Sequence, residues 1–221
     1  MAGKHTSPET RERLLNAATE VFANSGFEHA TVRDICKRAG ANIAAVNYHF
    51  GDKERLYDAI MDRALEQAQE RLIPELTGAA GPAEARLAAF VRAFLHRSLR
   101  PDATHWLMRL MEREWVAPTA ALDRVMERFV LKVRDYLRGI AEELLGARGT
   151  PELVSDCVVS VMSQCVHLRT GKEMIKRLRG IRDYDDATIE AMAAHVTQFS
   201  VAAMRGLSTA GVSSPAPRRR K

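Results

Sequence analysis

The 221-residue chain has only three cysteines, Cys36, Cys157 and Cys165. Because their number is odd and their spacing matches no metal-ligand pattern, they argue against a disulfide framework and are typical of reduced thiols in a cytoplasm. The sequence also lacks an apolar run that approaches the roughly 20 residues of a membrane-spanning helix. Its first residues, MAGKHTSPETRER, carry charges with no apolar segment behind them. We therefore expect a cytoplasmic protein with neither a signal peptide nor a transmembrane helix.

Catalytic motifs are missing as well. The sequence contains no Ser-His-Asp motif, no HExxH zinc motif and no glycine-rich phosphate loop. These absences argue against a small helical enzyme, and we expect neither catalytic activity nor a cofactor or metal. Two other classes stay open, a DNA-binding protein and a helical adaptor that binds protein partners.

The net charge of +5 is a weak indicator of a nucleic-acid partner. The last four residues, Arg218 to Lys221, carry four positive charges, so the rest of the chain is close to neutral. By composition, residues 211–221 form a disordered basic tail, which we expect to be a solvated end. The case for DNA binding therefore depends on where particular residues lie.

Helix-start signals follow one another closely in the N-terminal part of the chain. Ser7 begins a first helix, which Ser25-Gly26 should end. The sequence TVRD resembles a capping box that opens a second helix, and Asn42 and Asp52 are typical N-caps of a third and a fourth. The fourth helix is long and should close at 74–78. Further helices, with no convincing strand pair, are expected over 82–100, 103–115, 118–145, 150–168 and 185–207.

Two short helices joined by a short turn with glycine are typical of a helix-turn-helix motif, in which the second helix enters the DNA major groove. Small residues there let the backbone approach base edges, and Asn47 can read adenine with two hydrogen bonds. The alternatives are a purely structural corner, an Asn47 that bonds only backbone, and a His49 that packs under its helix. The predicted DNA contacts are Thr31, Arg33, Asn42, Ala44, Ala45, Asn47, Tyr48, His49 and Lys53.

Residues 11–60 resemble the N-terminal domain of the TetR family of bacterial transcriptional repressors. The resemblance rests on the Gly26-Phe27 bend, TVRDI, the RAG turn, YHF and the DKERL start of the fourth helix. The stretches NIAAVNYHFGDKE and THWLMRLMEREWVAPTAALDRVM are similar to the CecR-like branch. Family members usually have Val-Ser in place of Ala41-Asn42 and Tyr in place of Asn47, differences that concern the operator sequence.

The resemblance implies an all-α homodimer with a DNA-binding domain at 1–52 and a ligand-binding and dimerisation domain at 53–210. The sequence supports pairing independently, because the helix at 150–168 is apolar nearly all round and the last helix has a near-heptad apolar stripe. The predicted dimer residues are Val158, Met162, Cys165, Ile189, Met192, Val196, Phe199 and Ala203.

The resemblance also implies a small-molecule effector that binds in the C-terminal domain. We expect a ligand-responsive repressor of a palindromic double-stranded DNA operator, in which the fourth helix is the lever and the regulated gene encodes an efflux transporter. A non-inducible regulator of the same fold is the alternative. The candidate pocket residues, which could equally be plain core, are Trp106, Arg109, Met111, Glu112, Trp115, Met126, Phe129 and Met162.

Overall fold

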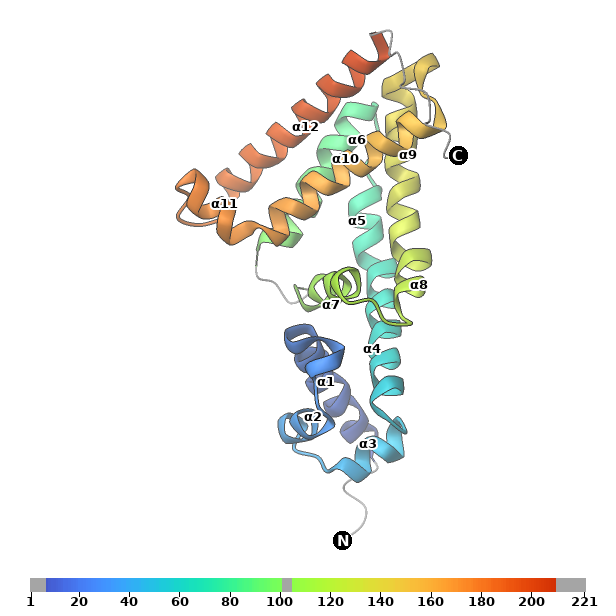
Figure 1. Cartoon of the computed structure of the whole chain (residues 1–221), viewed down its shortest axis with the longest axis vertical. Coiled ribbons are helices and arrows are strands. Elements are labelled where there is room, and N and C mark those ends of the chain that lie inside the picture. The colour runs from blue at the N-terminus through green and yellow to red at the C-terminus, as the bar shows by residue number, and fades with distance from the viewer. Residues whose placement is uncertain (1–6, 101–104, 210–221) are drawn as a thin grey trace, which may run out of the picture. The chain divides into compact units, whose positions relative to one another are not determined.

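The structure, a computed structural model, describes residues 7–100 and 105–209 (Figure 1). These residues form helices joined by short turns and contain no strand, which confirms the all-α prediction. The chain divides into two compact units. The first comprises Met1–Pro74 and Arg100–Lys132, and the second Glu75–Leu99 and Val133–Lys221. The domain boundaries proposed from the sequence stay a prediction, and the tail at 211–221 lies outside the described residues.

The first unit holds the helices that carry the predicted DNA contacts. Its core is formed by side chains such as Phe22, Ile35 and Leu56, which are fully buried where α1 packs against α2 and α4. Its elements are α1 (Pro8–His29), α2 (Val32–Ala39), α3 (Ile43–His49), α4 (Lys53–Gln67), the π-helical turn η1 (Ala68–Leu72), α7 (His105–Val116), α8 (Leu122–Val125) and the π-helical turn η2 (Met126–Val130). Helix α7 packs against α1, so a segment from the middle of the sequence contributes to the core of this unit.

The second unit is built around α6, against which α10 and α12 pack (Figure 1). Along the sequence, the division between the units falls within the short α5 (Ile73–Thr77), and α9 begins in the first unit. The remaining elements are α6 (Ala83–Leu99), α9 (Leu131–Leu145), η3 (Gly146–Arg148), α10 (Pro151–Thr170), α11 (Lys172–Arg179) and α12 (Asp186–Thr209). No helix of the described residues is long and apolar enough to cross a membrane.

The structure corrects several predicted helix boundaries. Helix α1 does not end at Ser25-Gly26 but bends there, because Gly26 has φ +77° and helical hydrogen bonding then resumes as far as His29. The predicted helix at 118–145 begins only at Leu122, and η2 interrupts its α-helical pattern. Helix α11 was not predicted. Gly171 is the only residue between the end of α10 and the start of α11, and no side-chain cap marks that start.

Two glycines with opposite backbone conformations provide a test of the turn that joins α2 to α3. Gly40 ends α2 with φ +60°, whereas Gly139 lies inside α9, and a methyl group added at either position would meet no neighbouring group within 4 Å. Alanine at Gly40 should therefore lower the free energy of unfolding by about 1 kcal/mol. Alanine at Gly139 should raise it by roughly 0.5–1 kcal/mol. Calorimetry of the two variants checks both, and shifts of the same sign would contradict the assigned conformations.

Candidate nucleic-acid interface

Three side-chain caps fix the starts of α2, α3 and α4. The hydroxyl oxygen of Thr31 accepts the backbone N–H of Asp34 at 3.1 Å, which confirms the predicted cap of α2. Asn42 Oδ1 accepts the backbone N–H of Ala45 at 2.9 Å. Asp52 Oδ1 accepts the backbone N–H of Arg55 at 2.8 Å. Each cap satisfies a backbone donor that a helix start leaves unpaired, so each start is set by the sequence beside it.

The turn between α2 and α3 is short and closed by backbone hydrogen bonds. Gly40 adopts the left-handed conformation, and the backbone N–H of Ala41 donates to the carbonyl oxygen of Cys36 at 3.0 Å. The turn thus connects helices of eight and seven residues. This order of short helix, tight glycine turn and short helix is the arrangement of a helix-turn-helix motif.

Helix α3 has a buried face and an exposed face. Val46 and Phe50 are buried and dock the helix on its own unit, with the Arg11 guanidinium 5.3 Å from the centre of the Phe50 ring. Tyr48 is 68% exposed and Ile43 51% exposed, although both carry large apolar groups. Thr31, Arg33, Asn42, Ala44 and Asn47 are also exposed. Six of the nine predicted contact residues therefore have side chains that solvent, and hence DNA, can reach.

The other three predicted contacts are placed differently. Ala45 is only 2% exposed, because its methyl group faces the core of the unit rather than solvent. Lys53 is half-buried, with its ammonium 4.4 Å from the Phe27 ring centre and 3.4 Å from the Glu28 carbonyl oxygen. His49 is half-buried, and its Nε2 atom has no hydrogen-bond partner among the residues that the structure describes. Direct DNA contacts by these residues stay a prediction.

An open hollow separates α2 from α3 on this surface. Two cationic residues of α2, Arg33 and Lys37, lie on one side, and Ile43 and Ala44 of α3 lie on the other. Ala41, Asn42 and Cys36 complete the lining. The residues that sequence reasoning missed here are Lys37 and Ile43. Lys37 was detectable, because it lies one turn after Arg33 on the same face of α2.

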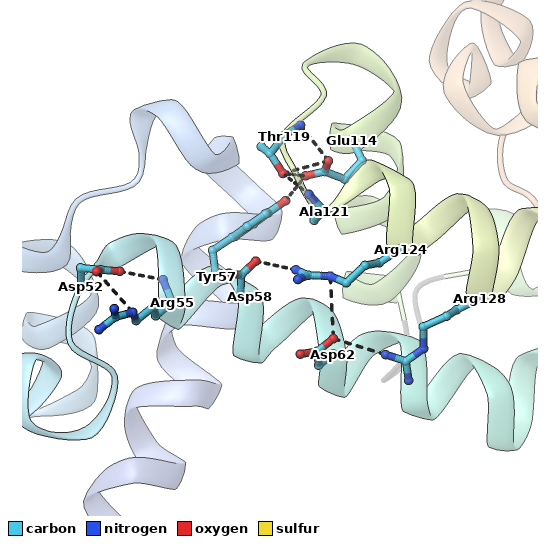
Figure 2. A network of polar contacts seen from close by, with 10 residues as sticks. All are labelled: Asp52, Arg55, Tyr57, Asp58, Asp62, Glu114, Thr119, Ala121, Arg124 and Arg128. Carbon is cyan, nitrogen blue, oxygen red and sulfur yellow. Dashed lines mark hydrogen bonds and ion pairs between the residues drawn. The ribbon is translucent and has the colours of Figure 1, made fainter.

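A buried hydrogen-bond network fixes α4 to the end of α7 (Figure 2). The Tyr57 hydroxyl on α4 donates to Glu114 Oε1 of α7 at 2.5 Å. Glu114 is 0% exposed and also accepts the backbone N–H and the hydroxyl of Thr119, both at 2.9 Å. Burial, followed by the hydrogen bond to Glu114, raises the pKa of Tyr57, which therefore stays protonated and remains a donor.

Two arginines extend the connection along α4 (Figure 2). Arg124 of α8 donates to Asp58 at 2.5 Å and lies 3.8 Å from Asp62, while Arg128 of η2 lies 3.3 Å from Asp62. These side chains are partly exposed, so each pair contributes only modestly. They attach α4 to α8 and η2, the two elements that follow α7 in the sequence, whereas Tyr57 attaches it to α7 itself.

The predicted pocket residues do not all share one environment. Trp106, Arg109, Glu112 and Trp115 are half-buried on α7. Met111 and Phe129 are buried in the first unit, Met126 is exposed on η2, and Met162 is half-buried on α10 in the second unit. Their role in effector binding stays a prediction.

The predicted dimer residues divide into two groups. Five of them are buried within the chain itself, namely Val158, Cys165, Ile189, Met192 and Val196. Phe199 is 58% exposed and Ala203 is exposed, both on α12, and Met162 is half-buried on α10. Val159, an exposed residue of α10 next to Val158, was missed. Only the exposed group can supply area to a partner subunit.

The three cysteines are free and buried, and no group of potential metal ligands occurs among the described residues. Burial raises the pKa of all three thiols, that of Cys165 to about 12. Since the thiolate is the reactive form, we expect Ellman's reagent to react slowly with the native protein at pH 8 and rapidly with three thiols in denaturant. A native thiol that reacts within seconds would contradict the burial.

Comparisons with known proteins agree with this geometry. Residues 14–60 match the family model described as bacterial regulatory proteins, tetR family. Residues 83–206 match the model of the C-terminal domain of the HTH-type transcriptional dual regulator CecR. The chain is 28% identical to the HTH-type transcriptional dual regulator CecR of Shigella flexneri over 211 residues, which cover 90% of this chain and 93% of that protein.

Solved structures show the same fold. A TetR transcriptional regulator from Chloroflexus aurantiacus has a TM-score of 0.62 at 21% identity, covering 86% of this chain and 93% of that one. AibR, solved with isovaleryl coenzyme A and operator DNA, has a TM-score of 0.65 at 17% identity, covering 86% and 97%. The fold and the helix-turn-helix surface thus define a DNA-binding transcriptional regulator. The chain belongs to the TetR family, and its C-terminal domain is of the CecR type.

Proposed function

We propose that this regulator is a homodimeric, ligand-responsive repressor in which α3 enters the major groove of a palindromic operator. The observation that carries the proposal is the exposed face of α3, held between two capped helix starts at Asn42 and Asp52. A helix docked in this way presents Asn47 and Tyr48 outward while Val46 anchors it. Asn47 suits adenine, and the Tyr48 hydroxyl suits a phosphate oxygen.

A second copy of the chain is the partner that a palindrome requires. Val159 on α10 and Phe199 on α12 are exposed apolar residues on helices that pack together, and small residues such as Ala203 permit close approach. A twofold pair would place two α3 helices on successive major grooves, about 34–36 Å apart. Glutamate at Phe199 should then weaken the dimer in sedimentation experiments, whereas glutamate at Leu178, exposed on α11, should not.

Two observations support ligand response, a solved structure of the same fold that contains a ligand and the attachment of α4 to α7. AibR was solved with both a coenzyme A ester and operator DNA. Here α4 begins directly after α3 and is attached to α7, the helix that carries most of the candidate pocket residues, through Tyr57 and Glu114. An effector that favours one position of α7 would therefore shift α4 and change DNA affinity. The regulator would act in the bacterial cytoplasm, and the gene that it represses would encode an efflux transporter.

Selection of genomic DNA fragments by the purified full-length protein tests DNA recognition. We expect enrichment of fragments that share an inverted repeat, with an affinity that falls as salt rises because phosphate contacts release counterions. Enrichment without any shared sequence, or no retention of DNA, would overturn the proposal.

A thermal-shift screen against metabolites and antibiotics then tests the effector. A compound that raises the melting temperature and releases the operator supports ligand response. A flat screen would favour the non-inducible alternative.

A further inference from the structure

The exposed isoleucine at the start of α3 is the feature that the proposed function does not yet use. A single exposed apolar side chain is ordinary on a protein surface. Ile43 differs because of its position, since it lies on the face of α3 that also presents Ala44 and Asn47. It also lines the hollow opposite the two cations Arg33 and Lys37. The hollow therefore combines an apolar wall with a positive one.

The chemistry of the major groove indicates what an aliphatic side chain can recognise there. Base edges present hydrogen-bond donors and acceptors, which isoleucine cannot satisfy, and one apolar group, the 5-methyl of thymine. Ile43 and Asn47 are four residues apart on a helix and therefore neighbours on its surface. An amide that suits adenine thus lies beside an aliphatic group that suits a thymine methyl.

We propose that Ile43 is a specificity-determining residue that contacts the 5-methyl group of a thymine in each operator half-site, next to the base pair contacted by Asn47. The inference rests on the proposed function, since it requires α3 to lie in the major groove. Arg33 and Lys37, across the hollow, suit the phosphates that flank this thymine and set the depth of the helix. The half-site therefore contains an A·T-rich step at this position.

The test removes single methyl groups from the DNA. Deoxyuridine replaces each thymine of the selected operator in turn, because uracil differs from thymine only by the missing methyl. In a second series, a cytosine·guanine pair and a 5-methylcytosine·guanine pair replace the same thymine·adenine pair, so that the methyl group alone differs between the two duplexes. Affinities are measured at one fixed salt concentration for the wild-type protein, for Ile43→Ala and for Lys37→Ala.

We expect uracil at one position of a single half-site to weaken wild-type binding about 4-fold, the effect of losing one buried methyl group. The symmetric replacement in both half-sites should weaken it about 15-fold, because two buried methyl groups are lost. At the same position, 5-methylcytosine should bind more tightly than cytosine. Both differences should vanish in Ile43→Ala. Lys37→Ala should bind all these operators more weakly but retain both differences, because it removes a charge rather than the apolar contact.

Wild-type affinity that is unchanged at every uracil position would overturn the inference while leaving the proposed function intact. Methyl sensitivity that persists in Ile43→Ala would also overturn it and would assign the contact to another residue, such as Ala44. Failure of the wild-type protein to select any operator would overturn both. Since Ile43 is half exposed and begins a helix in which alanine is favourable, Ile43→Ala should fold normally, which circular dichroism verifies.

Discussion

Replacement of Glu114 by alanine should lower the free energy of unfolding by about 3–5 kcal/mol. The substitution leaves the buried Tyr57 hydroxyl without its acceptor and removes the partner of two donors on Thr119. It also opens a cavity, because Glu114 is fully buried. Urea denaturation at one protein concentration measures the effect, since dimer stability depends on concentration.

Matched variants separate the network from a general effect of substitution. Tyr57→Phe keeps the ring and removes one donor, so it should cost about 1–3 kcal/mol. Glu127→Ala removes an exposed carboxylate on η2 and should change stability by less than about 0.5 kcal/mol. Equal effects of Glu114→Ala and Glu127→Ala would show that the buried network does not stabilise the unit.

The raised pKa of Tyr57 adds a pH dependence to this result. A tyrosine whose pKa is higher in the folded state contributes stability below its unfolded pKa, about 10, and loses that contribution as pH rises beyond it. Stability of the wild type should therefore fall more steeply above about pH 10 than stability of Tyr57→Phe. The same slope in both proteins would mean that Tyr57 ionises as readily folded as unfolded.

Replacement of Asn47 by alanine should produce the largest loss of operator affinity. A side-chain pair to an adenine edge is worth about 1–3 kcal/mol of discrimination, and a twofold dimer loses it in both half-sites. The expected loss lies between roughly 30-fold and 10⁴-fold, with little change in stability because Asn47 is exposed. Fluorescence anisotropy with the selected operator measures it at fixed salt.

Asn24→Ala provides the control, since it removes an exposed amide from α1 rather than α3. It should leave affinity unchanged. The dependence of affinity on salt should also be the same in Asn47→Ala as in the wild type, because a base contact neutralises no phosphate. An Asn47→Ala variant that binds normally would remove this residue from base recognition.

The sequence was most informative where a structural feature depends on neighbouring residues. The caps at Thr31, Asn42 and Asp52 were predictable because each side chain accepts a backbone N–H three positions further along the chain. The π-helical turns η1 and η2 were not, because an extra residue in a helical turn is stabilised by surrounding packing. Hydrogen bonds between residues close in sequence thus specified where α2, α3 and α4 begin.

Burial was the harder quantity to infer. An apolar stripe on α10 or α12 is consistent with packing inside one chain or between two chains, and five of the predicted dimer residues are already buried within the single chain. Ala45 illustrates a related ambiguity, since small residues suit both a groove and a tightly packed interior, and this one is buried. Ile43 was not among the predicted contacts, because a large aliphatic side chain at the start of a helix is usually a core residue, whereas here it is 51% exposed.

Glu114 left a sequence signal that went unused. It lies four residues after Leu110 and three after Met111, both fully buried, and so falls on the apolar stripe of α7. A carboxylate at such a position needs donors from elsewhere in the fold. Its partner Tyr57 is 57 positions away in sequence, and no local pattern connects the two.

Because α3 has one buried and one exposed face, the DNA sequence preferred under the proposed function could change while the fold stays the same. Val46 and Phe50 keep the helix in place, whereas Asn47 and Tyr48 contribute little to holding the molecule together. Substitutions on the outward side should therefore accumulate at small thermodynamic cost, and under the proposed function each one would change which operator sequence the protein prefers. A few substitutions on this exposed face, whether natural or engineered, would then bring a different set of genes under control.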